Sequence, residues 1–189
     1  MKIFRSSQIK LYLLVLGLFV LQSVDAQTIE SFHSEWDDRF SEWNIAFFDE
    51  EDAGSMSLKW RLRDDWTGWN FELLEKSGQI RLKWSDDPNL WELICEGQVV
   101  TARSKRRNDF LERRVSDGNH QLTFWSRFRN DMSEWELRDT MTFGDFRIYM
   151  EWQGDPRDWI VIDETNGALS QEIRLMCSFL AIYHSIPKN

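Results

Sequence analysis

Few residues of this chain have the type and spacing that catalysis requires. Glu134 and Glu136 are two residues apart, so on an extended strand their carboxyl groups share one face. A glycosidase instead needs two carboxylates that face each other across a cleft. The three histidines are scattered without metal-ligand spacing: His33, His120 and His184. The sequence also has no G-x-S-x-G, C-x-x-C or phosphate-binding glycine loop, so we expect no enzyme activity, cofactor or metal ion.

One short basic stretch interrupts this acidic chain and is a candidate binding site. Its cations are Lys105, Arg106, Arg107, Arg113 and Arg114. Such a cluster is suited to an anionic lipid head group, a polyanionic glycan or an acidic protein partner. The alternative is an exposed loop and strand face that Asp109 and Glu112 balance, because surface charge runs are usually solvated.

Two tryptophans are candidates for stacking on sugar rings. Trp66 and Trp125 fall outside the alternation that places apolar side chains on the inner face, and Trp125 is out of phase with Leu122 and Phe124. We expect both to face outward, where an indole face can pack on a pyranose ring. The alternative is that they pack within the protein, as we expect for the other tryptophans.

Aspartates recur in the loops that the tryptophans flank. They are Asp37, Asp38, Asp64, Asp65, Asp86, Asp87, Asp109, Asp131, Asp155 and Asp158. Carboxylates on one rim suit Ca²⁺, but no loop has the alternating acidic spacing of a dedicated calcium site. Aspartate also stabilises turns by accepting hydrogen bonds from its own backbone, and we favour that interpretation.

Tryptophan spacing reveals the elements that must position these residues. Six residues separate Trp36 from Trp43, Trp84 from Trp91 and Trp152 from Trp159. Looser copies run from Trp60 to Trp69 and from Trp125 to Trp135, and a copy without tryptophan runs from Ser104 to Arg113. Glycine turns such as Ala53-Gly54 and Ser77-Gly78 lie between the copies. Turn signals at this spacing predict an all-β meander of hairpins.

The predicted hairpins favour a closed barrel. Segments such as Ile80–Trp84 and Phe146–Trp152 alternate apolar with charged residues, as half-buried strands do. We expect both tryptophans of each hairpin to face the core as a cross-strand pair. Six hairpins give about twelve strands, and closing them into an antiparallel barrel removes the two open edges.

A barrel of that size encloses a lumen that other residues must fill, and the C-terminal segment has the composition to fill it. Residues 169–185 read as a helix that is apolar on every side, with Ser170 as N-cap and Glu172 in the first turn. Pro187 ends it. We therefore predict an all-β fold with one helix, in which the barrel encloses the C-terminal segment.

This architecture resembles the tubby-like superfamily, which includes the LURP-one-related proteins and the phospholipid scramblases. The match lies at the end of the chain, in the segment Asp158-Trp159-Ile160-Val161-Ile162-Asp163 and in the apolar helix from Leu175 to Tyr183. The resemblance implies a barrel around a core helix. Members of the superfamily bind phosphoinositide head groups or act at membrane lipids, but no functional residue is carried over.

The first residues predict export. Lys2, Arg5 and Lys10 precede an apolar run, and Val24-Asp25-Ala26 places small residues at a cleavage site, so residues 1–26 read as a cleavable signal peptide. Residues 27–189 then form one domain in the periplasm or outside the cell, without a transmembrane helix.

The charge of that domain limits its possible partners, and its two cysteines allow one disulfide. Cleavage removes three basic residues and one acidic residue, and the net charge changes from −9 to −11, which disfavours nucleic acid. Cys95 and Cys177 either form a disulfide in the oxidising compartment or remain buried thiols. We expect an envelope binding or structural module that contacts lipid or a protein partner, or else a carbohydrate-binding or carbohydrate-cleaving domain.

Overall fold

The computed structural model describes residues 28–48, 50–138 and 144–188, and the predicted signal peptide lies outside them. The described chain forms twelve strands, one short 3-10 turn at Arg61–Arg63 and one helix. The strands are β1 (Ile29–Ser34), β2 (Glu42–Phe47), β3 (Glu50–Trp60), β4 (Asp65–Leu73), β5 (Lys76–Leu82), β6 (Leu90–Cys95), β7 (Gln98–Ser104), β8 (Glu112–Ser116), β9 (Gln121–Phe128), β10 (Asp131–Leu137), β11 (Phe146–Trp152) and β12 (Asp155–Asp163). The helix is α3 (Gln171–Ser185).

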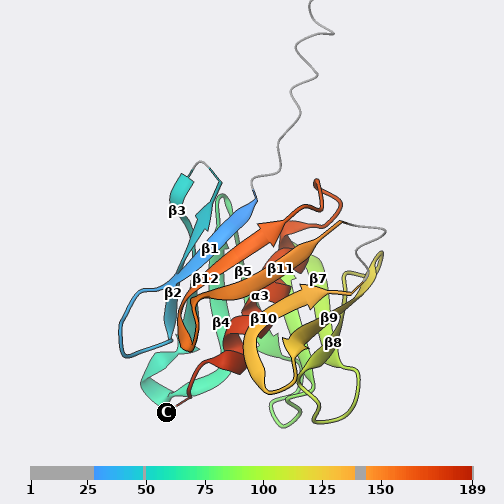
Figure 1. Cartoon of the computed structure of the whole chain (residues 1–189). Helices are drawn as coiled ribbons and strands as arrows, with labels where there is room; N and C mark the ends of the chain where they lie inside the picture. Colours follow the sequence, from blue (N-terminus) through green and yellow to red (C-terminus); the bar gives the residue numbers. More distant parts are fainter. Residues whose placement is uncertain (1–27, 49, 139–143, 189) are drawn as a thin grey trace, which may run out of the picture.

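The twelve strands close into one antiparallel barrel (Figure 1). Each strand pairs with its neighbours in the chain, and β1 pairs with β12 to complete the ring, with Phe32 opposite Trp159 and His33 opposite Asp158. No strand edge remains open in the described sheet, which removes the sites at which edges aggregate. The predicted meander barrel is confirmed.

Helix α3 fills the barrel, as predicted. Its side chains from Ile173 to Ile182 are buried, and Phe179 and Leu180 have no exposed surface. Ser170 caps the N-terminus by accepting a hydrogen bond from the Ile173 amide at 3.3 Å, and Pro187 follows the last turn. The helix begins at Gln171, two residues later than expected. None of the helices in the described part of the chain is long and apolar enough to cross a membrane.

The core also contains one ion pair that the apolar pattern did not predict. Arg174 of α3 places its Nε 2.5 Å from Oδ2 of Asp163, and both side chains are almost fully buried. Thr165 donates its hydroxyl to Asp163 at 2.5 Å and accepts from Nη2 of Arg174 at 3.0 Å. This network links the helix to the end of β12, and the ion pair offsets part of the cost of burying the two charges.

Six hairpins repeat one pattern at the end of the barrel where the odd-numbered strands finish, here called the Trp-loop end. In the first half or near the middle of each even-numbered strand, one large side chain points into the barrel and is at most 1% exposed. These inner-ring residues are Trp43, Trp69, Trp91, Arg113, Trp135 and Trp159. Trp69 and Trp91 pack on Phe179 of α3, with ring centroids 5.8 and 5.0 Å apart. The inner ring therefore holds the C-terminal half of the helix.

The expectation that both tryptophans of a hairpin face the core is wrong. The residue at the end of each odd-numbered strand, or just beyond it, points outward, and the aromatic examples are 39 to 63% exposed. These outer-ring residues are Trp36, Trp60, Trp84, Arg106, Phe128 and Trp152. The pairing register shifts just before Trp60 in β3 and before Trp152 in β11, so a bulge turns each side chain to the other face.

Two predicted turns are also wrong. Gly54 and Gly78 lie inside β3 and β5, and the turns come several residues earlier. A Cβ added to Gly78 would collide with the Ile94 carbonyl oxygen and would lie 2.5 Å from Cζ of Phe71. This glycine is therefore needed for close packing between strands and not for a turn.

The two cysteines are not paired in the structure. Cys95 at the end of β6 and Cys177 in the middle of α3 are both buried free thiols. The thiol of Cys95 donates to the Ser77 carbonyl oxygen at 3.6 Å. Burial raises the pKa of both thiols, which makes them unreactive.

Candidate functional site

The aspartates of the Trp-loop end are turn-forming residues. In five of the six hairpins, Oδ1 of one aspartate accepts a hydrogen bond from the amide two residues later; they are Asp65, Asp87, Asp109, Asp131 and Asp155. Each of these aspartates lies four residues before an inner-ring residue. Within the residues that the structure describes, no group of three or more histidine, cysteine or acidic side chains is placed to hold a metal ion. The aspartates thus fix the loops from which the inner ring starts.

The structure divides the predicted basic cluster into two parts. Lys105, Arg106, Arg107 and Arg114 are exposed on the β7–β8 hairpin, whereas Arg113 points into the barrel and has no exposed surface. Arg113 therefore does not belong to the surface patch. Lys105 is partly neutralised, because its Nζ donates to Glu112 at 2.9 Å.

Arg113 occupies the inner-ring position that tryptophan fills in the other five hairpins. Its guanidinium donates to the Asn89 carbonyl oxygen at 3.1 Å and lies 2.8 Å from Nε2 of His184. The ring of Phe110 lies 5.0 Å from its central carbon. Burial lowers the pKa of Arg113 to about 10, and burial followed by this nearby cation lowers the pKa of His184 well below 6.5. Arg113 is thus part of the core and cannot receive a surface ligand, and His184 lies half-buried beside it.

The two candidate sugar-stacking tryptophans lie in different surroundings. Trp125 lies on the outer wall, as predicted, but the guanidinium of Arg138 covers its ring at 4.4 Å. Trp66 packs against Trp69 at 5.8 Å, and its Nε1 donates to Asp64 at 2.7 Å. These two contacts hold the indole of Trp66 in one orientation, and its remaining surface faces a cleft.

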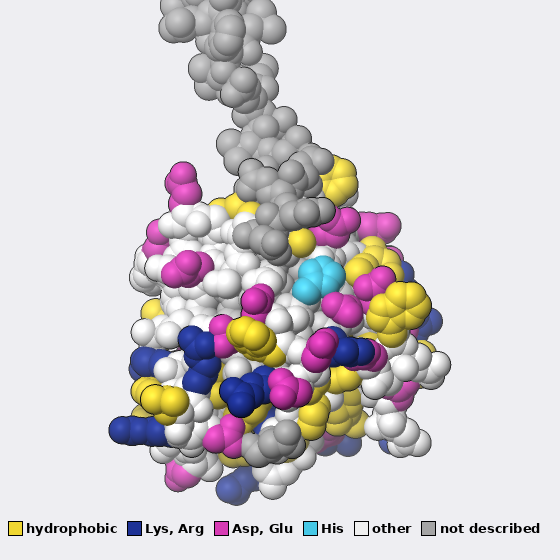
Figure 2. Space-filling model, turned by 90° about the vertical axis from the view of Figure 1, so that its left-hand side faces the viewer, with side chains coloured by type: hydrophobic (Ala, Val, Ile, Leu, Met, Phe, Trp, Pro, Cys, Tyr) yellow, Lys and Arg dark blue, Asp and Glu magenta, His cyan; other side chains and the backbone are white. Residues whose placement is uncertain are grey.

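This cleft lies at the Trp-loop end, between the β1–β2 and β3–β4 loops, and has a volume of about 1080 Å³. Its aromatic and apolar lining is Trp36, Phe40, Leu58, Leu62, Trp66 and Pro187. Its polar lining is Asp38, Arg39, Ser41, Glu42, Arg61 and Asp64. Arg61 and Glu42 form an ion pair within it. Figure 2 faces the side of the barrel on which β2 and β3 run, and hydrophobic side chains there alternate with acidic and basic ones.

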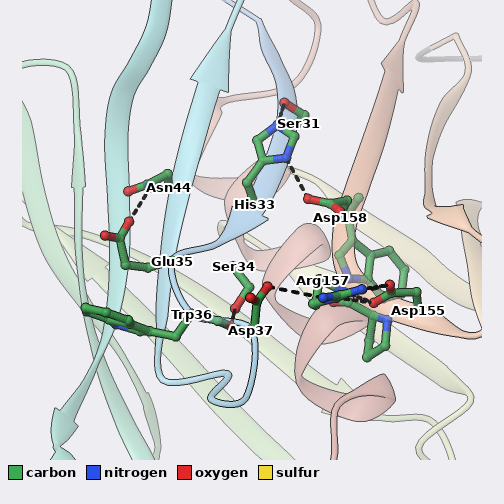
Figure 3. Close-up of polar contacts among 12 residues, drawn as sticks. Ser31, His33, Ser34, Glu35, Trp36, Asp37, Asn44, Asp155, Arg157 and Asp158 are labelled. Atoms are coloured by element: carbon green, nitrogen blue, oxygen red, sulfur yellow. Dashed lines mark hydrogen bonds and ion pairs between the residues drawn. The ribbon is translucent and has the colours of Figure 1, made fainter.

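A second polar constellation lies on the outer wall, where β1 meets β12 (Figure 3). Oγ of Ser31 is 2.8 Å from Nε2 of His33, and Nδ1 of His33 is 2.9 Å from Oδ1 of Asp158. Ser31 and His33 are alternate residues of β1 and share its outer face. The three side chains therefore form one continuous chain of hydrogen bonds.

An arginine holds the loops beside this constellation. Arg157 forms two hydrogen bonds to Asp155 from its Nε, and its Nη1 donates to Asp37 of the β1–β2 loop at 3.1 Å. Hydrogen bonding to Asp155 raises the pKa of Arg157, and the same contact lowers the pKa of Asp155. Figure 3 shows this bridge between β12 and the loop that follows β1.

Ser31, His33 and Asp158 were not recognised as a group from the sequence. The first two form a Ser-x-His pattern on one strand, which is visible in the sequence, but Asp158 lies 125 residues beyond His33. The pairing of the first strand with the last is what brings the carboxylate opposite the imidazole.

Comparisons with known proteins add no functional assignment. No family model, curated protein or solved structure matches the chain. Its function is therefore inferred from the geometry of the cleft and of the β1–β12 wall.

Proposed function

We propose that this chain is an exported binding module that holds a neutral carbohydrate in the cleft of the Trp-loop end. The observation that carries the proposal is the position of Trp66 and Trp36 in one cleft together with charged side chains of both signs. The likeness to tubby-like barrels is part of this proposal only as a likeness of fold.

The chemistry of the lining favours a sugar over other small ligands. A pyranose ring presents apolar C–H faces, which pack on indole, and hydroxyl groups, which donate to carboxylates and accept from guanidinium groups. Trp66 is held by Asp64 and Trp69, so little side-chain entropy is lost when a ring stacks on it. Because Arg61 and Glu42 pair with each other, the cleft has no excess of cations that would select a polyanion.

Glycan-array screening followed by titration calorimetry tests the proposal. We expect Trp66→Ala and Trp36→Ala to weaken binding of the selected glycan by about tenfold or more, which corresponds to about 1.4 kcal/mol. Trp125→Ala is the matched control, because Arg138 already covers that ring, and its affinity should stay unchanged. Absence of any glycan ligand, or an equal effect of all three substitutions, would contradict the proposal.

A second candidate function rests on the outer-ring position of the β7–β8 hairpin. Arg106 and Arg107 are exposed there, where other hairpins carry an aromatic residue, and neither belongs to an ion pair among the described residues. Such cations are free to contact an anionic lipid surface or an acidic protein partner. Vesicles containing phosphatidylserine should then bind in a salt-sensitive manner, and Arg106→Glu/Arg107→Glu should abolish binding. Salt-independent binding would exclude this candidate.

A further inference from the structure

We propose that Ser31, His33 and Asp158 form a nucleophilic centre that hydrolyses small carboxylic esters. The proposal is independent of carbohydrate binding in the cleft. The arrangement has the order that acyl transfer requires: a hydroxyl within hydrogen-bond reach of an imidazole, and a carboxylate on the other nitrogen of that imidazole.

The hydrogen-bond partners fix the role of each group. An ionised Asp158 can only accept, so the proton between it and His33 belongs to Nδ1 of the imidazole. Nε2 then has a free lone pair and accepts the Ser31 hydroxyl proton at 2.8 Å. His33 is thereby held in the tautomer of a general base, and Asp158 orients the ring and stabilises the imidazolium that forms.

The fold holds these three groups rigidly. Ser31 and His33 lie on one strand, and His33 is directly opposite Asp158 in the β1–β12 register. Arg157 ties the start of β12 to the β1–β2 loop through Asp37, so we assign it as a positioning residue. Sites on regular strands keep their geometry better than sites on loops.

Strand β1 also offers a backbone donor beside the serine. Its register with β2 shifts between Ile29 and Ser31, and the pairing with β12 begins only at Ser31. Glu30 is thus the extra residue of a bulge directly before Ser31. A backbone amide next to the nucleophile is the kind of donor that an oxyanion needs.

Exposure defines the substrate class. The residue His33 is half-buried, whereas Ser31 is buried and 6% exposed, so solvent reaches the base more easily than it reaches the nucleophile. Because Ser31 is almost fully buried, a small acyl group reaches its Oγ with the least displacement of neighbouring atoms. We therefore assign acetyl esters as the substrate class.

The reaction balances with water as the only co-reactant. Oγ of Ser31 bonds to the ester carbonyl carbon while its proton moves to Nε2 of His33. The carbon–oxygen bond to the alcohol then breaks, and the leaving oxygen takes the proton from His33. Water adds to the acetyl-serine while His33 takes its proton, and His33 then returns this proton to Oγ as the bond to the acetyl carbon breaks. Acetic acid leaves, and the Ser31 hydroxyl is restored.

Two assays test the centre in the intact chain. p-Nitrophenyl acetate should be hydrolysed and should label Ser31 with an acetyl group, which peptide mass spectrometry of acid-quenched samples identifies. His33→Gln and Asp158→Asn should each slow labelling by about 10²-fold or more, and Ser31→Ala should abolish it. Unfolding midpoints of the variants show whether each is folded.

The chain contains a matched control pair. His120 and Asp117 have the same imidazole–carboxylate contact, at 3.1 Å, but Ser116 donates its hydroxyl to the His120 carbonyl oxygen and not to the ring. Ser116→Ala and His120→Gln should leave labelling of Ser31 unchanged. Free imidazoles also cleave p-nitrophenyl acetate, so the labelled residue is decisive. If wild-type Ser31 is not labelled, or if its labelling survives His33→Gln, the proposal is wrong.

Discussion

Two buried arginines differ in whether a carboxylate pairs with them, and this difference determines how much stability is lost when each is removed. Arg174 pairs with the buried carboxylate of Asp163, whereas Arg113 contacts carbonyl oxygens and His184 and has no carboxylate at ion-pair distance in the described residues. Removing one member of a buried ion pair leaves the other charge buried without a partner. Removing an unpaired cation also removes the cost of its desolvation.

We therefore expect the same substitution to be costly at Arg174 and nearly neutral at Arg113. Arg174→Met should lower the free energy of unfolding by about 3–5 kcal/mol, because Asp163 loses its partner. Arg113→Met should change it by less than about 1 kcal/mol, since the other hairpins carry an apolar ring at that position. Urea unfolding measures both. Equal destabilisation by the two substitutions would contradict this assignment.

His184 makes the stability of the fold depend on pH. Because burial and Arg113 lower the pKa of His184, the unfolded chain binds a proton near pH 6.5 that the folded chain does not. Stability is then fully present above pH 6.5 and is lost as the pH falls from there toward the pKa of the folded state, by at most about 1.4 kcal/mol per pH unit.

Urea unfolding between pH 7.5 and pH 5 measures this loss, with His184→Phe as the comparison. The phenylalanine keeps the stacking on Phe110 and Trp135 but does not titrate. Its unfolding free energy should therefore depend less on pH in this range. An unchanged slope would show that another group is responsible.

Among the elements, five of the six hairpins at the Trp-loop end each have one aspartate that closes the turn. Oδ1 of Asp131 accepts from the Ser133 amide at 2.9 Å, four residues before Trp135 of the inner ring. Asp131→Ala should lower the free energy of unfolding by about 1 kcal/mol, the usual value of one such hydrogen bond. The adjacent, exposed Asn130→Ala is the control and should cost less than about 0.5 kcal/mol. Comparable losses would mean that the loop is not closed in this way.

The elements also show where sequence reasoning succeeds and where it fails. Alternation and turn spacing predicted the strands, and the all-round apolar pattern predicted the core helix, because these depend on local periodicity. Closure of the barrel was predicted from the cost of two open strand edges and not from a local pattern. Alternation did not predict the outward tryptophans, since the bulges before Trp60 and Trp152 shift the phase by one residue. It also placed turns at Gly54 and Gly78, where close packing requires glycine within a strand.

The candidate sites were less predictable than the fold, because they depend on contacts between residues that are distant in the sequence. Trp66 breaks the local alternation and lines the cleft, but it also packs on Trp69 of the inner ring, which the alternation does not predict. Arg113 was grouped with its sequence neighbours, although strand pairing turns it into the core. Asp158 joins His33 only through closure of the ring, which is a contact between the ends of the chain and leaves no local signal.

For the molecule as a whole, one structural property supports both proposed sites. The pairing of β1 with β12 encloses α3, aligns the loops around the inner ring and places Asp158 opposite His33. The buried tryptophans of that ring contact the helix from several hairpins, which fixes the helix within the barrel. Both sites therefore depend on closure of the barrel.

Backbone nuclear Overhauser effects in the isotope-labelled chain report on closure without any substitution. We predict cross-strand contacts between Ser31 and Ile160, Phe32 and Trp159, and His33 and Asp158, as strong as those between β11 and β12. If the contacts of β11 with β12 and of β1 with β2 are observed while those between β1 and β12 are missing, the barrel is open and the Ser31 centre does not form.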